Sequence, residues 1–556
     1  MMEATIKLKK FPMQLYSSAY AEIPKVAAPA DSSVESSEML TCIDWILHKF
    51  GRSDAALPRM RLGPEDNLNN PLMLQFFTWD TLHKELSWWK HLESETARLS
   101  EMGFTQVWIP PPNKAAVPNG RGYDAYDLWD LGEFNQRRSV PTRWGTRQEL
   151  LNACEAARQK GIDIIIDAVL NHKLGADRKE LIPAIPVDLQ NRLKEIGPER
   201  LIEAWTTFDF AGRGGKYSAL RWNSEHFTGL DWDHRTRSKG IYRLSGQGHE
   251  GWSKYVDTEL GNYDYLLGVD IDHRHPAVEQ DLLEWGSWII KTTGATGFRL
   301  DAIKHIDYRF ILKFLQCTRQ QVGTSFKLFS VSEFWSGDLK VILPYIRKLR
   351  GETAFFDVPL HMNFHNASRC GSQYDLRRIF NGTIVKVRPN DAVTFVDNHD
   401  TVQGQSLESW VENNFKIQAY SLILLRGRGH PCVFYGDLYP NPECYSENIA
   451  LNLALLIAVR KLFAYGPTND YLVHKNCIGF VRLGNEQHAG CAVLLSNRED
   501  DSGTYVHTLR MNVGRKNAGT TFRTFMPPHG IVTIRSGGWG DFTCVANHVQ
   551  VWVKAV

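Results

Sequence analysis

The stretch GFRLDAIKH, from Gly297 to His305, carries the pattern on which the fold assignment of this chain depends. An apolar run ends there in charged residues, between a small-residue turn, TTGAT, and a helix-like run, IDYRFILKFLQ. One explanation is a helix start, in which Asp301 caps the next helix and Arg299 pairs with it. The other is that several strand ends of this kind converge on one pocket. The rest of the chain distinguishes between the two.

Short apolar runs recur along the chain and alternate with longer amphipathic segments. The strand candidates are MLQFFTW, QVWIPP, IDIIIDAVL, TGFRLD, FKLFSVSEF, AFFDVPL, AVTFVDN and PCVFYGD. Helical patterns lie between most of them, and several end in Gly just past a basic residue, as helix C-caps do. Eight strands that alternate with helices predict an α/β fold, a (β/α)8 TIM barrel. A doubly wound open sheet is the alternative.

Three further regions flank or interrupt the predicted barrel, which takes residues 71–172 and 276–464. Residues 173–275 separate the third strand from the fourth, and a connection of that length needs structure of its own, so we expect an inserted subdomain. Residues 465–556 alternate like the strands of an antiparallel β-sandwich domain. Residues 1–70 lack sustained periodicity apart from MLTCIDWILHKF, and we expect a partly disordered N-terminal extension.

The composition and the charge exclude several classes of partner. Lys and Arg (64) nearly balance Asp and Glu (62), so the net charge of +2 gives no electrostatic case for nucleic acid or an anionic membrane surface. No apolar run reaches the length of about 18 residues that a membrane span needs. No apolar segment follows the N-terminal lysines as in a secretory signal. The nine cysteines are scattered and odd in number, which indicates free thiols in a reducing compartment, so we expect a cytoplasmic protein.

Polar residues follow four of the predicted strands at their C-terminal ends, where a barrel of this kind has its active site. They are Asp167, Asn171 and His172 after the third strand, Arg299, Asp301, Lys304 and His305 after the fourth, Glu333 and Trp335 after the fifth, and Asp397, Asn398, His399 and Asp400 after the seventh. Barrel topology therefore brings Asp301, Glu333 and Asp400 to one rim. Such a cluster is costly to desolvate and stability alone does not require it, so we interpret it as functional.

Three carboxylates with aromatic neighbours suit the cleavage of a glycosidic bond. One carboxylate attacks the anomeric carbon, and a second protonates the leaving oxygen. Arg299, two residues before Asp301, points to the same barrel face and is expected to hold Asp301 ionised, as a nucleophile needs. The motifs HExxH, GxxxxGKS/T and GxSxG, which indicate competing chemistries, are absent.

In these segments the chain resembles the α-amylase family of glycoside hydrolases, and the resemblance covers roughly residues 71 to 556. Four signature regions match in order. Within the family, the chain is most similar to liquefying-type bacterial α-amylases and their intracellular fungal relatives. The segments that carry this pattern are VWIPPPNKA, GYDAYDLWDLGEF, ELGNYDYLLGVDID, TFVDNHDTVQGQSLES, VFYGDLY and GWGDF.

The resemblance implies a role for each matching residue. Asp301 matches the nucleophile, Glu333 the general acid/base, and Asp400 the third carboxylate, which binds sugar hydroxyls and stabilises the distorted ring. The matching substrate-binding residues are Arg299, His172 and His399 at the cleavage subsite, Tyr123 as the aromatic platform under that sugar, and Lys304 and Trp335 at neighbouring subsites.

A calcium site is implied in the same way. Calcium prefers hard oxygen ligands from carboxylates, amides and backbone carbonyls. Asn171, Asp264, Asp270 and the carbonyl of His305 match the family's main calcium site, beside the active cleft.

Bacterial liquefying enzymes have a second metal cluster next to the first, and here the chain departs from them. Asp231 and Asp272 match that cluster, but Ser253 and Arg274 stand where two of its carboxylates would be. A guanidinium there removes most of the attraction for another divalent ion, and Arg274 could instead pair with Asp231 or Asp272. We therefore expect one bound calcium and none near Arg274.

Together these features predict an endo-acting α-1,4-glucan hydrolase that cleaves starch or glycogen with retention at the anomeric carbon. The expected partner is an α-glucan polysaccharide or a maltooligosaccharide, with no nucleic acid and no membrane, and the protein is expected to be a monomer. One alternative is a 4-α-glucanotransferase, which shares the covalent intermediate but passes it to a sugar hydroxyl. Another is a non-catalytic glucan-binding protein on the same fold.

Overall fold

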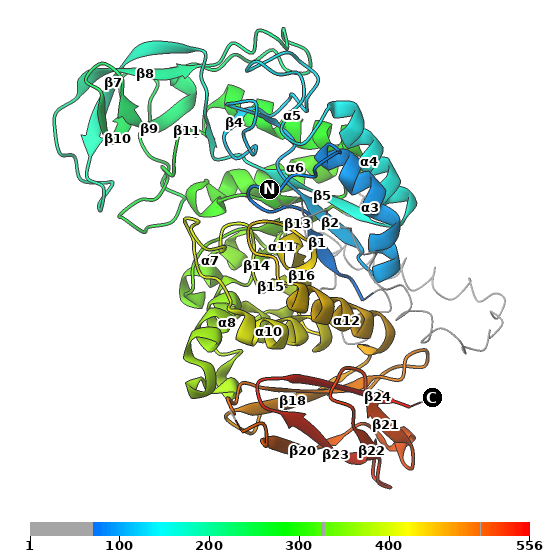
Figure 1. Cartoon of the computed structure of the whole chain (residues 1–556). Coiled ribbons are helices and arrows are strands. Elements are labelled where there is room, and N and C mark those ends of the chain that lie inside the picture. The colour runs from blue at the N-terminus through cyan, green and yellow to red at the C-terminus, as the bar shows by residue number, and fades with distance from the viewer. Residues whose placement is uncertain (1–69, 324–327, 501, 556) are drawn as a thin grey trace, which may run out of the picture. The chain divides into compact units, whose positions relative to one another are not determined.

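A closed barrel of eight parallel strands forms the centre of the chain (Figure 1). The computed structural model describes residues 70–323, 328–500 and 502–555, so the predicted extension lies outside the described residues apart from Asn70. In barrel order the strands are β1 (Met73–Gln75), β2 (Gln106–Ile109), β5 (Asp163–Ala168), β12 (Gly297–Leu300), β13 (Phe329–Ser332), β14 (Ala354–Phe356), β15 (Ala392–Phe395) and β16 (His430–Phe434). The (β/α)8 prediction is confirmed, and the open sheet is excluded.

Helices follow the barrel strands and surround them. They are α3 (Trp88–Met102), α4 (Arg147–Gln159), α5 (Pro276–Thr293), α6 (Tyr308–Val322), α7 (Leu339–Lys348), α8 (Val358–Cys370), α9 (Ile384–Val387), α10 (Asn413–Leu425), α11 (Tyr435–Leu438) and α12 (Glu447–Phe463). Local chemistry sets several of their starts. At α4, for example, Thr146 and Glu149 form a reciprocal capping box, which satisfies two of the free N–H groups of the first turn.

The sixth strand is shorter than the sequence pattern indicates. The run AFFDVPL was expected to be a single strand, but β14 ends at Phe356 and the next residues begin α8. The Asp357 side chain caps that helix by accepting the N–H of Leu360, and Pro359 lies in the first turn. An apolar run that contains a capping aspartate before a proline therefore divides into a strand and a helix.

The segment after the third barrel strand forms a six-stranded antiparallel sheet of its own. Its order is β6 (His172–Lys173), β11 (Val269–Ile271), β9 (Phe227–Asp233), β10 (Ser238–Leu244), β7 (Arg178–Val187) and β8 (Arg200–Thr207). The edge strand β8 alternates buried and more exposed side chains from Ile202 to Thr206, as expected for a sheet with one face in water. A short hairpin of β3 (Lys114–Ala115) and β4 (Ala125–Asp127) lies between the second and third barrel strands in sequence.

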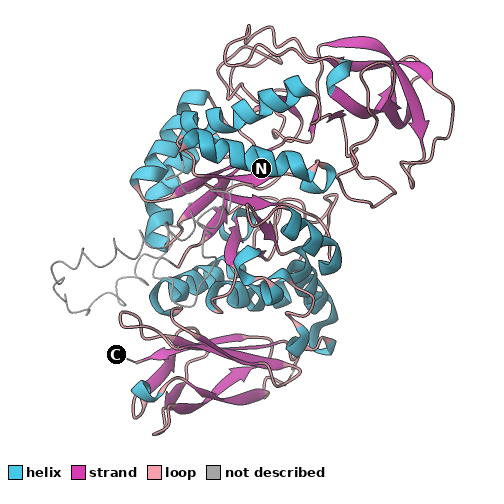
Figure 2. Cartoon of the chain, turned by 180° about the vertical axis from the view of Figure 1, so that it is seen from behind, coloured by secondary structure: helices cyan, strands magenta, loops and turns pink. Residues whose placement is uncertain are grey.

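The C-terminal region is an antiparallel β-sandwich, drawn as a strand-rich layer in Figure 2. One sheet contains β17 (Thr468–Tyr471), β18 (Cys477–Arg482), β19 (Cys491–Ser496), β24 (Val549–Lys554), β21 (Thr521–Thr524) and β22 (Ile531–Thr533), and the other contains β20 (Val506–Asn512) and β23 (Trp539–Val545). Val481 and Leu494 of the first sheet share a buried cluster with Met511 and Phe542 of the second. The strand β20 buries only two of its seven side chains.

The barrel strands are buried on both faces, which explains why their sequences read as continuous apolar runs. Asp167 and Arg299 lie one residue before the ends of β5 and β12, so these two charged residues sit near the C-terminal rim of the barrel. Within the described ranges, none of the helices combines the length and the apolar character needed to cross a bilayer.

Candidate active site

One guanidinium holds three carboxylates at the C-terminal end of the barrel. Arg299, on β12, is 1% exposed. Its Nη1 donates to Asp167 Oδ1 at 2.8 Å and to Asp301 Oδ1 at 2.6 Å, and its Nη2 donates to Glu333 Oε2 at 2.7 Å. The third, fourth and fifth barrel strands therefore end at one polar cluster.

The turn after β12 brings the fourth and fifth strand ends together. Ala302 has a left-handed backbone (φ 48°), which is uncommon for a residue with a Cβ. In this turn the N–H of Ala302 donates to Glu333 Oε2 at 3.0 Å. The helix-start explanation for Asp301 is wrong, because the cap of the following helix α6 is Asp307, which accepts the N–H of Arg309.

Burial shifts the protonation of all three predicted catalytic carboxyls. It raises the pKa of Asp301 to about 6, although Arg299 acts in the opposite direction. Burial also raises the pKa of Glu333, again against Arg299. Burial and the charge of Glu333 raise the pKa of Asp400 to about 8. A pKa of about 6 leaves Asp301 mostly ionised at neutral pH, as a nucleophile needs, and the raised pKa of Glu333 favours its protonated form, as an acid needs.

Three rings stack beside this cluster. The Tyr123 ring lies 5.1 Å from the His399 ring and 5.6 Å from the Trp79 ring, and both pairs are nearly parallel. The Tyr123 hydroxyl donates to Asp167 Oδ2 at 2.8 Å. Burial and the charge of Arg299 keep the pKa of His399 well below its usual value, so this ring is neutral. The stack offers a flat aromatic surface next to the carboxylates, as a sugar ring requires.

The remaining predicted substrate-binding residues lie around the same rim. His172 Nε2 lies 2.9 Å from the Tyr123 carbonyl, and burial lowers the pKa of His172 to about 4. Lys304 donates to the carbonyl of Trp335 at 3.4 Å and forms an ion pair with Glu259 of the inserted segment.

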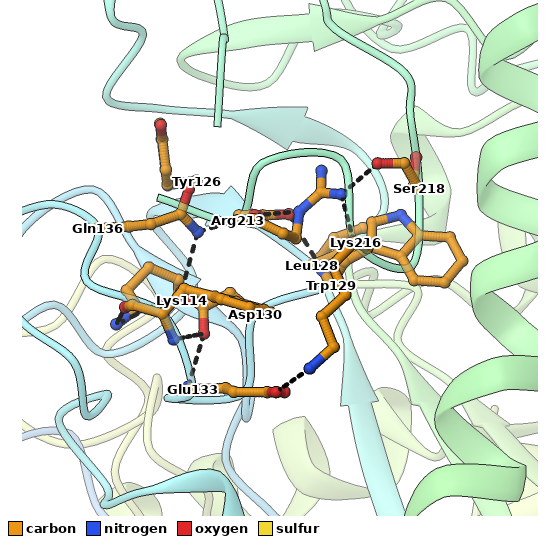
Figure 3. A network of polar contacts seen from close by, with 12 residues as sticks. Lys114, Tyr126, Leu128, Trp129, Asp130, Glu133, Gln136, Arg213, Lys216 and Ser218 are labelled. Atoms are coloured by element: carbon orange, nitrogen blue, oxygen red, sulfur yellow. Dashed lines mark hydrogen bonds and ion pairs between the residues drawn. The ribbon is translucent and has the colours of Figure 1, made fainter. Parts of the chain in front are cut away.

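A buried polar network fixes the hairpin that carries Tyr123 (Figure 3). The Lys114 ammonium donates to the carbonyls of Ser139 and Val140 at 2.9 and 2.6 Å, and lies 3.5 Å from Asp130 Oδ2. Asp127, opposite Lys114 in the hairpin, accepts the Arg213 Nε of the inserted segment at 2.8 Å. The hairpin that carries Tyr123 is therefore held in place by contacts within itself and with the inserted segment.

Three of the four predicted calcium ligands, Asn171, Asp264 and Asp270, lie close together. Asn171 Nδ2 lies 3.4 Å from Asp270 Oδ1, whereas Asn171 Oδ1 is buried and lacks a hydrogen-bond partner. Burial and the nearby charge of Asp264 raise the pKa of Asp270 well above its usual range, and burial raises the pKa of Asp264 to about 8. A cation would offset the cost of burying the charged forms of Asp264 and Asp270, so this donor set fits a hard metal ion.

The set contains only two carboxylates, with an amide and a backbone carbonyl. Among the described residues no group of three or more His, Cys, Asp or Glu side chains is arranged to hold a metal ion. Where the second metal cluster would lie, Arg274 donates to both oxygens of Asp272, at 2.7 and 2.8 Å. The expected pairing of Arg274 with a neighbouring aspartate is therefore confirmed.

Two contributors to the site were missed by the sequence. Asp167 was noted at the end of the third strand but given no role, and it accepts hydrogen bonds from Arg299, Tyr123 and the Trp108 indole. Trp79 closes the expected first strand, MLQFFTW, and was interpreted only as a strand residue. The available signal for both was their position at a barrel strand end.

Comparisons with known proteins agree with this architecture. A family model described as the catalytic domain of alpha amylase matches residues 262–443. The glucan 1,4-alpha-maltohexaosidase of Bacillus sp. (strain 707) is 44% identical over 492 residues, 88% of this chain and 93% of the relative. The cytoplasmic alpha-amylase of Escherichia coli (strain K12) is 38% identical over 501 residues, 87% of this chain and 99% of the relative. The solved structure of an alpha-amylase from Geobacillus thermoleovorans with acarbose shares the fold, with a TM-score of 0.58, 17% identity, and coverage of 88% of this chain and 100% of that chain.

Proposed function

The chain belongs to the α-amylase family of glycoside hydrolases, and from that membership we propose that it is an endo-acting α-1,4-glucan hydrolase that acts on starch- or glycogen-type glucans with retention. The observation that carries the proposal is the contact of one buried guanidinium with both Asp301 and Glu333. This arrangement holds a nucleophile and an acid on neighbouring strand ends.

The proposed reaction proceeds in two displacements. Glu333 protonates the glycosidic oxygen while Asp301 attacks the anomeric carbon, which gives a covalent glycosyl intermediate. Glu333 then removes a proton from a water molecule, whose oxygen attacks the anomeric carbon and breaks its bond to Asp301, so that the sugar leaves with its original anomeric configuration. Asp400 holds sugar hydroxyls, and Tyr123 supports the ring that is being distorted.

Retention is supported by the closeness of the two carboxyl groups. Retaining enzymes have their carboxyls about 5–5.5 Å apart, whereas inverting enzymes separate them by about 6.5–9.5 Å to admit water. The Arg299 guanidinium donates to Asp301 through Nη1 and to Glu333 through Nη2, which brings the two carboxyls close to each other. We propose that their separation falls in the short class.

The two alternatives are not favoured. The named relatives are hydrolases that cover most of this chain, and the catalytic carboxylates expected of an enzyme are present. Chains longer than the substrate, formed from maltooligosaccharides, would identify a glucanotransferase instead.

We also propose one calcium ion, held by Asn171, Asp264, Asp270 and the carbonyl of His305. The orphaned amide oxygen of Asn171 and the raised pKa values of the two aspartates support it. When bound, the ion supplies positive charge that ties the insertion to the barrel. The bidentate pair of Arg274 and Asp272 supports the absence of a second ion there.

The remaining proposals concern organisation and location. We propose a barrel of residues 71–172 and 276–464, an inserted subdomain at 173–275, and a C-terminal domain at 465–556. A cytoplasmic location is supported by the similarity to the cytoplasmic alpha-amylase of Escherichia coli. We propose a monomer that binds α-glucan.

A reducing-sugar assay with soluble starch tests the function. We expect rapid release of internal fragments, and the anomer formed first, observed by proton NMR, should be the α form. No release of reducing sugar, or a first product in the β form, would contradict the proposal.

A further inference from the structure

Glu443, in the loop that follows α11, collects five hydrogen-bond donors from one short segment at the end of β1. Its carboxylate accepts the N–H groups of Trp79, Asp80 and Thr81 at 3.2, 2.9 and 2.7 Å. It also accepts the hydroxyls of Thr81, at 2.7 Å, and of Thr78. Three consecutive backbone N–H groups and two hydroxyls therefore converge on a single carboxylate, and hydrogen bonds to a charged acceptor are among the strongest that a loop can form.

The same segment is held from its other side by two arginines. Arg121 Nε donates to the Trp79 carbonyl at 2.9 Å, and Arg143 Nη2 donates to the Asp80 carbonyl at 2.8 Å. Both the N–H and the carbonyl of Trp79 are thus bound by side chains of other loops. This leaves the backbone at Trp79 little freedom to move.

The restrained residue presents its indole to the site. The Trp79 ring is nearly parallel to the Tyr123 ring (15°) and to the His399 ring (17°), with centroids 5.6 and 5.5 Å away. The Arg121 guanidinium lies over the Trp79 ring, 5.0 Å from its centroid, and the indole is otherwise only partly buried, so part of it stays accessible to a ligand. It extends the aromatic surface that Tyr123 and His399 begin beside the carboxylates.

We propose that Glu443 is a positioning residue for glucan binding: it fixes residues 78–81 so that the Trp79 indole continues the aromatic platform, and it does so without touching the substrate. The inference rests on the proposed function, because the platform is assigned to a sugar chain. Glu443 makes no contact with Asp301, Glu333 or Arg299 among the hydrogen bonds and ion pairs of the described residues, so its effect should fall on binding rather than on bond cleavage.

The test compares Glu443→Ala and Glu443→Gln with Trp79→Ala and with the double variant Glu443→Ala/Trp79→Ala. The matched control is Glu447→Gln, the same change at an exposed carboxylate four residues later. Starch hydrolysis gives kcat and KM. Calorimetry with maltoheptaose on a Glu333→Gln background gives Kd without turnover, and thermal unfolding reports the fold.

For Glu443→Ala we expect KM and Kd to rise about 10-fold while kcat stays within about twofold. The amide of Glu443→Gln keeps one acceptor oxygen for most of the donors, so KM and Kd of this variant should rise less, about threefold. Trp79→Ala should raise KM and Kd as much as Glu443→Ala does. In the double variant the loss of Glu443 should raise them by less than about a further twofold, because both changes act through the Trp79 ring. The control should match the wild type.

Unchanged KM and Kd in Glu443→Ala, a loss confined to kcat, or additive effects in the double variant would overturn the proposal. If Glu443→Ala does not fold, Glu443→Gln takes its place in every comparison, and failure of both to fold would make Glu443 a folding residue and the proposal wrong. A wild-type protein that binds maltoheptaose but releases no sugar from starch would contradict the proposed function alone, since the Kd series still decides the role of Glu443.

Discussion

At the residue scale, Arg299 opposes what burial does to its neighbours. Asp167, Asp301 and Glu333 are all taken out of water, which favours their neutral forms, while the guanidinium favours their charged forms. Arg299 therefore favours the ionised form of Asp301, as expected, but burial opposes this effect. Burial prevails enough to leave the pKa of Asp301 near 6.

The two catalytic carboxyls can be tested by nearly isosteric changes. Glu333→Gln cannot donate the proton, and Asp301→Asn cannot form the covalent intermediate, so each should lower kcat on starch by at least about 1,000-fold. Thermal unfolding should show that both variants fold. Near-wild-type activity in either variant would remove that residue from the mechanism.

The acid side of the pH profile should report Asp301. A nucleophile must be ionised, and the folded pKa of about 6 lies above the ordinary 3.8, so kcat/KM should fall as pH drops through about 6 and should level off about one pH unit above it. Because the carboxyls are coupled, this apparent pKa belongs to the cluster. An acid limb that begins only near pH 4 would show that burial does not control the nucleophile.

At the element scale, the hairpin of β3 and β4 is the part that carries the aromatic platform. Lys114 is 2% exposed and fills a cage of backbone carbonyls beside Asp130. A buried cation with this many partners holds the loop around residues 134–141 to the hairpin.

The variant Lys114→Met tests that role. It leaves Asp130 buried without its cation, which should lower the free energy of unfolding by about 3 kcal/mol and raise KM for starch. Lys216→Met is the control from the same network, because Lys216 pairs with Glu133 on the surface. Equal thermal midpoints for the two variants would contradict a special role for Lys114.

At the scale of the whole molecule, the insertion and the barrel meet at the proposed calcium site and at Arg213. Asn171 follows a barrel strand, whereas Asp264 and Asp270 belong to the inserted segment. A cation among them would join two regions that the chain places about 100 residues apart.

Removal of the metal should therefore affect stability. Chelation should lower the thermal midpoint, reloading should restore it, and metal analysis should give one calcium per chain. Asp270→Ala should abolish the reloading effect, whereas Asp231→Ala, outside the proposed ligand set, should preserve it. Two tightly bound ions, or a midpoint unchanged by chelation, would overturn the assignment.

The sequence by itself determined the barrel and the four polar strand ends. Strand and helix periodicity is local, so GFRLDAIKH and the other apolar runs could be recognised without their partners. Once the barrel was predicted, its topology placed Asp301, Glu333 and Asp400 on one rim. The resemblance supplied their roles.

Only the tertiary structure decided how these ends interact. The contact of Arg299 with Asp167 spans 132 residues, and that of Thr78 with Glu443 spans 365. Such contacts leave no periodic trace in the sequence, because hydrogen bonds and ring stacking depend on side-chain directions that packing sets. The same reason explains why Trp79 read as a strand residue, and why the carboxylate that holds it could be found only in the folded chain.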